Sequence, residues 1–205
     1  MKRQRVFAIA AIAALTLGYQ WLNKTVQGGW QPHLFLDDWI PLAPIWVVPY
    51  LLTLPGLLIV AIISAHYMDN AHFWRFACAM AVTMLSCYAC FWLLPTFVQR
   101  PKLMGDEWAT NLLRRLYAQD KPNNACPSLH IALAACWCLA WVRWLPRGSG
   151  VWGFILIVIV FSTLFTKQHY VLDVLGGCGV GGVSGVSGVW SKWVAPFEYE
   201  KDSNE

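Results

Sequence analysis

Two residues near the end of the chain, His169 and Asp173, have the types and the spacing that covalent catalysis requires. They lie in the segment Phe-Thr-Lys-Gln-His-Tyr-Val-Leu-Asp, residues 165–173. On an α-helix, residues four apart lie on one face, so the two side chains can meet. A carboxylate that accepts one ring N–H of histidine fixes the tautomer and leaves the other nitrogen free as a nucleophile or base. For this pair alone, the alternative is a snorkelling histidine and a helix-capping aspartate.

A second segment, Cys-Pro-Ser-Leu-His at 126–130, opens an apolar run. Proline suits the first position of a helix, so Pro127 predicts a helix start there. The free N–H groups and the positive dipole end of a helix N-terminus attract anions. Ser128 adds a hydroxyl donor, and His130 lies in the first turn. The segment therefore predicts an anion site beside a second histidine.

Two cations complete this set of residues. Arg100, followed by proline, offers a guanidinium fork that fits phosphate, and Lys167 lies two residues before His169. Together these groups suit phosphoryl transfer without a metal or other cofactor. One histidine attacks phosphorus, fixed donors stabilise the charged oxygens, and the other histidine acts as acid and base.

Metal binding is the rival interpretation of the same side chains. His130, His169 and Asp173 could form a facial set of ligands. Arg100 and Lys167 argue against it, because cationic side chains disfavour a bound metal ion close by. The sequence therefore predicts no metal site.

Composition places these residues in a membrane protein. The chain has 205 residues, of which 58% are hydrophobic and only 13% are charged, whereas soluble domains carry about a quarter charged residues. Thirteen Trp and seven Tyr fit the aromatic belts at membrane interfaces. The formal net charge of +4 comes without a basic patch interleaved with aromatics, so no nucleic-acid partner is predicted.

The fold class predicted is all-α, a polytopic bundle of six transmembrane helices in a single domain over residues 1–205. The catalytic region covers about 95–180, and the charged tail 198–205 is predicted to be disordered. The predicted spans are 5–22, 43–65, 73–94, 127–145, 151–167 and 171–192.

Two further patterns concern how helices pack. In the longest loop, 95–126, an amphipathic helix is predicted over Asp106–Gln119, with a stripe made by three apolar side chains. That stripe comprises Trp108, Leu112 and Leu116. The last span carries small residues at four-residue spacing, which predicts close packing on another helix of the same chain. They are Gly177, Gly181 and Gly185.

Six spans place all the polar residues above on the membrane side opposite the N-terminus. The N-terminal side carries basic residues in short connections, so the positive-inside rule puts that side in the cytoplasm and the site outside. The basic residues on the N-terminal side are Lys2, Arg3, Arg5, Arg75, Arg143, Arg147 and Lys192.

These residues resemble the type 2 phosphatidic acid phosphatase superfamily of membrane lipid phosphatases. Its motifs are Lys-x6-Arg-Pro, Pro-Ser-Gly-His and Ser-Arg-x5-His-x3-Asp. Arg100-Pro101 matches the end of the first, Pro127-Ser128-Leu129-His130 the second with one change, and Ser162 with His169 and Asp173 the third. Pro-Ser-Leu-His together with His-Tyr-x-x-Asp also resembles the branch of inositol phosphorylceramide synthase-like phosphotransferases.

The resemblance implies a role for each matching residue. His169 is the expected nucleophile, Asp173 orients it, and His130 is the acid and base, while Arg100 and Ser128 bind phosphate. The chain departs from the motifs at Leu93 and Thr163, where the family has Lys and Arg, and at Leu129, where it has Gly. Lys167 is expected to compensate for the missing cations. Further candidates are Lys102, Arg114 and Arg115.

The function predicted is hydrolysis of a lipid phosphomonoester or pyrophosphate through a phosphohistidine. The partners are the lipid substrate and the bilayer, and the location is the bacterial cytoplasmic membrane with the site facing outward. Transfer to an alcohol acceptor stays open, and so does a non-catalytic transporter or binder of lipid anions. His33, His66 and His72 match no motif, and Asp37 and Asp38 are interpreted as a solvated acidic turn.

Overall fold

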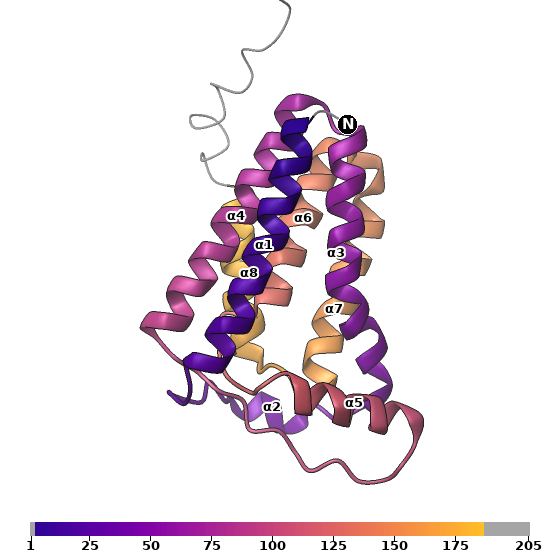
Figure 1. Cartoon of the computed structure of the whole chain (residues 1–205). Helices are drawn as coiled ribbons and strands as arrows, with labels where there is room; N and C mark the ends of the chain where they lie inside the picture. Colours follow the sequence, from indigo (N-terminus) through magenta and orange to yellow (C-terminus); the bar gives the residue numbers. More distant parts are fainter. Residues whose placement is uncertain (1–2, 187–205) are drawn as a thin grey trace, which may run out of the picture.

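A computed structural model describes residues 3–186, and this part of the chain is helical without a regular strand (Figure 1). The helix order matches the pattern of apolar runs. The elements are α1 (Arg3–Thr25), α2 (Phe35–Trp39), the short 3-10 turn η1 (Pro44–Trp46), α3 (Val47–Tyr67), α4 (Asn70–Leu93), α5 (Trp108–Gln119), α6 (Leu129–Trp144), the 3-10 turn η2 (Pro146–Gly148), α7 (Ser149–Phe165) and α8 (Val171–Val186).

Apolar helices occupy each of the six predicted regions. Four segments are long and apolar enough to cross a membrane, namely α1, Pro44–Tyr67, α4 and Pro146–Phe165. Helices α6 and α8 are apolar but have only 16 described residues each. The end of the last predicted span and the tail 198–205 lie outside the described residues. The helices indicate a membrane protein, and the number of spans stays a prediction.

Helix α6 forms the centre of the bundle. Nearly every residue from Leu129 to Trp141 is buried, and its neighbours include α4, α7 and α8. Many of these residues are alanine, which allows helices to approach closely. A helix that is apolar and buried on all sides is expected at the core of such a protein.

The glycine stripe of α8 packs against α6, which confirms that it serves packing within the chain. A Cβ on Gly177 would lie 2.7 Å from the carbonyl oxygen of Ser128. A Cβ on Gly181 would overlap the carbonyl oxygen of Ala132. Only glycine permits this approach. The contact holds the first turns of α6 and α8 side by side at one end of the bundle.

Helices α2 and α5 lie across that same end, below the long helices in Figure 1. The helix predicted over Asp106–Gln119 is confirmed as α5, but its buried face differs from the prediction. Ala109 and Leu113 are buried, whereas Trp108 is 62% exposed. An apolar side chain left outward at the end of a membrane bundle suits the interfacial zone.

Two isolated β-bridges fix the chain around α5. Trp30 pairs with Thr96, and Phe97 pairs with Asn123. The backbone N–H of Val98 donates to the carbonyl of Pro122 at 2.9 Å. These bonds bring the two ends of the loop 95–126 together beneath the first turn of α6.

Candidate active site

Two histidines from different elements face each other at this end of the bundle. His130 lies in the first turn of α6, and His169 lies in the turn between α7 and α8. Their ring centroids are 6.2 Å apart with an interplanar angle of 61°. The ring of Tyr50 on α3 lies 4.6 Å from that of His130. The structure therefore brings together the two histidines that the sequence placed 39 positions apart (169 − 130 = 39).

Asp173 lies beside His169, although not on a shared helical face. Helix α8 begins at Val171, so His169 precedes the helix and Asp173 stands in its first turn. The His169 Nδ1 atom is 3.4 Å from Asp173 Oδ2. The same oxygen accepts a bond of 2.8 Å from the backbone N–H of Tyr170. A separation of 3.4 Å exceeds a hydrogen bond, and such contacts often tighten only when substrate binds.

Ser128 joins the two helices that carry these residues. Ser128, rather than Pro127 as predicted, is the boundary residue of α6, and its Oγ accepts from the N–H of Ile131 at 3.5 Å. The N–H of Ser128 donates to the carbonyl of Asp173 at 2.9 Å. The N–H groups of Leu129 and His130 have no acceptor within the helix by helical geometry, so they are suited to hold an anion.

Arg100 lies next to the turn that carries His169, but other protein groups bind it. Its Nη2 atom donates to Gln168 Oε1 and lies 3.5 Å from Asp120 Oδ2. Its Nη1 atom donates to the carbonyl of Asp120 at 2.6 Å. The guanidinium also stacks 4.6 Å from the ring centre of Tyr117. A phosphate would have to take over part of this coordination.

Asp120 is a site residue that motif reasoning missed. Besides contacting Arg100, its Oδ1 accepts from Asn23 Nδ2 at 2.6 Å and from the Tyr19 hydroxyl at 3.3 Å. Burial raises the pKa of Asp120, while the charges of Arg100 and His169 oppose that rise. This carboxylate links α1 to the phosphate-binding candidate.

Lys167 and Asp37 form a second connection that the sequence did not reveal. Lys167 Nζ donates to the carbonyl of Asp37 at 2.9 Å, and Asp37 Oδ1 accepts from the N–H of Val171 at 2.8 Å. Burial lowers the pKa of Lys167, and nearby Asp37 and Asp38 oppose this. Asp37 is buried and anchors α2 to the turn that carries His169, whereas Asp38 is exposed and pairs with His33.

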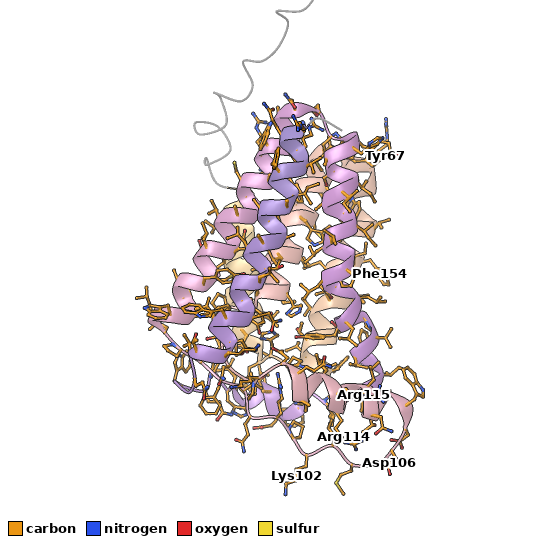
Figure 2. All side chains as sticks on the ribbon, in the orientation of Figure 1. Tyr67, Lys102, Asp106, Arg114, Arg115 and Phe154 are labelled. Atoms are coloured by element: carbon orange, nitrogen blue, oxygen red, sulfur yellow. The ribbon has the colours of Figure 1, made fainter. Side chains whose placement is uncertain are left out.

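The other candidate cations lie on the outer surface of the loop around α5. Figure 2 shows Lys102 directed away from the bundle, and all three side chains, Lys102, Arg114 and Arg115, are exposed. Arg114 donates to Asn111 and to the carbonyl of Gly105. In this structure the three side chains do not converge on His169.

A cavity of about 330 Å³ opens beside His130. Its walls come from α1, α3, α5 and α6, and its polar side chains include Tyr50 and Asp120. Within residues 3–186 there is no group of three or more His, Cys, Asp or Glu side chains able to hold a metal ion.

The chain was compared with models of known protein families. A model of the PAP2 superfamily matches residues 22–186, which include both histidines, Asp173 and Arg100. The chain belongs to the PAP2 superfamily. Members of this superfamily are generally phosphatases, so membership indicates an enzyme of phosphoester chemistry. Searches of curated proteins and of solved structures found no significant match.

Four side chains that were not predicted contact the candidate site residues. Gln168 directly precedes the catalytic candidate His169, so its position was a usable signal. Asp120 ends an amphipathic helix, and Asp37 stands in an acidic pair, where a solvated residue is the usual interpretation. Tyr50 offered no signal, because only the packing of α3 on α6 brings its ring to His130.

Proposed function

We propose that this PAP2 protein is a metal-independent lipid phosphate phosphatase with His169 as its nucleophile. The observation that carries the proposal is the contact between His169 and Asp173, 3.4 Å apart, with His130 facing the same ring. Because Asp173 lies on the Nδ1 side, it holds the proton there and leaves Nε2 free to attack phosphorus.

The proposed reaction has two steps. In the first, His169 Nε2 bonds to phosphorus, the bond between phosphorus and the lipid oxygen breaks, and protonated His130 gives its proton to the leaving oxygen. In the second, neutral His130 takes a proton from water, the hydroxide oxygen bonds to phosphorus, and the bond between phosphorus and His169 Nε2 breaks, which releases phosphate and free His169. One histidine thus alternates between acid and base, as general acid–base catalysis requires.

Charge on the phosphoryl oxygens is stabilised by the first turn of α6 and by Arg100. The N–H groups at that helix start, the Ser128 hydroxyl and a guanidinium are donors that favour the developing charge. We infer that the substrate phosphate displaces Asp120 from Arg100, since this arginine lies beside the turn of His169. Lys167 is the proposed second cation, and it would leave the Asp37 carbonyl to reach phosphate.

The position of the site supports a lipid as substrate. It lies at one end of apolar helices, and in the proposed placement this end is at headgroup level, where a lipid presents its phosphate. Exposed apolar side chains surround that end, including Phe35, Trp39 and Met104. We place six spans in a bacterial cytoplasmic membrane, with this end facing outward.

The test is phosphate release by the purified protein from long-chain phosphatidic acid in micelles containing EDTA. The proposal predicts turnover that EDTA does not stop and that His169→Ala abolishes. His66→Ala is the matched control, because His66 lies at the end of α3 remote from the site and should retain activity. Turnover that EDTA abolishes, or that survives His169→Ala, would overturn the proposal.

Transfer to an alcohol is the second candidate, because Pro127-Ser128-Leu129-His130 resembles a phosphotransferase motif. It shares the phosphohistidine and differs only in the acceptor. Formation of a new phosphoester when candidate alcohols are added, in place of free phosphate, would favour transfer. Binding of lipid phosphate without either product would favour a non-catalytic role.

A further inference from the structure

Helix α1 packs on α4, where the Tyr88 hydroxyl donates to the carbonyl of Leu15 at 2.7 Å, and its fully buried residues lie near its two ends. Its buried residues are Arg5, Leu22 and Asn23. Near the start of the helix, Arg5 Nη1 donates to the carbonyls of Ala65 at 3.0 Å and Met68 at 2.8 Å. At the other end, Asn23 bonds to Asp120. Between these two attachments, no residue of α1 is fully buried.

Two cavities occupy the space between α1 and α3 along this unburied stretch. One is the 330 Å³ cavity that reaches His130 and Asp120. The other measures about 380 Å³ and is lined by α1, α3, α4 and α6. Leu54 of α3 lines both cavities, so the two adjoin.

One of the adjoining cavities is apolar and the other is partly polar, which matches the hydrocarbon chain and the polar headgroup of an amphiphile. The larger one is lined by aliphatic and methionine side chains, and its one hydroxyl, that of Thr16, is bonded to the carbonyl of Ala13. Along α3 it extends from Leu54 to Ala61, about 10 Å at 1.5 Å per residue. The smaller cavity offers polar groups and is lined by His130, whose ring faces that of His169. A hydrocarbon chain fits the first, and a phosphate fits the second.

We propose that the hydrocarbon chain of the substrate lies in the apolar cavity between α1 and α3, and that its headgroup passes Leu54 to reach His169. This inference rests on the proposed function and adds a chain-recognition site to it. The residues that contact the chain include Ile12, Leu58, Met80, Met84 and Leu133.

The first test fills this cavity and compares two substrates. Ile12→Trp should lower kcat/KM for long-chain phosphatidic acid by roughly 10-fold or more, while para-nitrophenyl phosphate, which has no chain, should change by less than about 2-fold. The matched control is Ile59→Trp, which fills a second apolar cavity of about 380 Å³ between α3 and α7. That variant should leave kcat/KM unchanged for both substrates.

Several outcomes separate the two proposals. Equal loss for both substrates in Ile12→Trp, no loss, or the same selective loss in Ile59→Trp would overturn the chain site. If wild-type protein releases phosphate from neither substrate, the proposed function itself fails and this inference falls with it.

A second test uses the wild-type protein, so it does not depend on whether a variant folds. Phosphatidic acid with a diazirine in its chain should label peptides that contain Ile12, Met80 or Met84. Excess unlabelled phosphatidic acid should suppress the labelling, and phosphatidylcholine of the same chain length should not. If phosphatidylcholine competes equally, the cavity holds ordinary bilayer lipid and the proposal is wrong. Labelling confined to the cavity at Ile59 would also overturn it.

Discussion

Asp173 makes two contacts that substitution can separate. Its Oδ2 accepts from the N–H of Tyr170, which fixes the start of α8, and the same oxygen faces His169. An amide oxygen can still accept from a backbone N–H, but an amide carries no charge to stabilise an imidazolium or fix its tautomer.

Asp173→Asn is therefore expected to fold like the wild type and to lose activity. We predict that kcat falls by about 10²–10⁴-fold, with an unchanged thermal unfolding midpoint in detergent. Asp173→Ala should lower both quantities, because it also removes the capping bond. An Asn variant that keeps wild-type kcat would contradict the orienting role.

Asp120 should give the free energy of unfolding a pH dependence of known sign. Because burial raises its pKa, the folded state binds this proton more tightly than the unfolded state does. The ionised carboxylate thus costs stability at neutral pH, and the cost is relieved as pH falls through the folded pKa towards the ordinary value of 3.8.

We predict that the stability of the wild type relative to Asp120→Asn rises as pH is lowered from about 7 to about 4. Unfolding in detergent at several pH values measures this difference. Asp106→Asn is the control, because the Asp106 side chain is 95% exposed. A difference that is flat, or that falls as pH is lowered, would show that Asp120 does not carry a raised pKa.

At the residue scale, short motifs predicted the positions that the structure brings together, while long-range polar partners escaped prediction. His130, His169 and Asp173 stand in local patterns that can be read along the chain. Asp120 meets Asn23 from 97 positions away, and Asp37 meets Lys167 from 130 positions away. Such partners depend on how the loops fold over the bundle, which no local spacing encodes.

At the scale of helices, the junction of α6 and α8 decides whether the two halves of the site meet. Gly181 faces Ala132 without room for a Cβ, while Gly182 next to it has open space. Gly181→Ala should destabilise the protein by about 1–3 kcal/mol through overpacking, and it should lower kcat because His169 shifts away from His130.

Gly182→Ala is the matched control on the same helix. It should leave activity intact and stabilise the protein by up to about 1 kcal/mol, since alanine favours a helix over glycine. Thermal unfolding and phosphate release are measured for both variants. Equal behaviour of the two would contradict the packing of α8 on α6.

Helix positions could be predicted because apolar runs mark them, but helix faces and lengths could not. The apolar stripe predicted on α5 included Trp108, but the residues that are buried against the bundle are Ala109 and Leu113. An amphipathic pattern shows which face of a helix is apolar. At a membrane interface that face can contact either lipid or protein, so the pattern does not show which side chains the protein buries. The last span was predicted to start at Val171, where α8 does begin, so His169 lies in the preceding turn and does not share a helical face with Asp173 as the spacing argument expected.

At the scale of the whole molecule, the proposed orientation puts the two ends of the bundle on opposite sides of the membrane. Figure 2 shows Lys102 at the end that carries the site and Tyr67 at the other end. Both side chains are exposed. A membrane-impermeant maleimide should label Lys102→Cys in intact cells, and should label Tyr67→Cys only after the membrane is opened.

The seven native cysteines set the background, so labelling is compared with the parent protein. The reverse pattern would invert the proposed orientation. Labelling of both positions in intact cells would contradict the placement of α4 as a membrane span between them. In either case the chemistry of the site would be unaffected, because it depends on contacts within the bundle.

The covalent intermediate is the most direct test of this mechanism. Wild-type protein is mixed briefly with ³²P-labelled phosphatidic acid, quenched in alkali and digested. We predict a label that is stable in alkali, is released by acid and maps to the peptide containing His169, and that is missing in His169→Ala. Turnover without such a label, or a label on another residue, would contradict the mechanism.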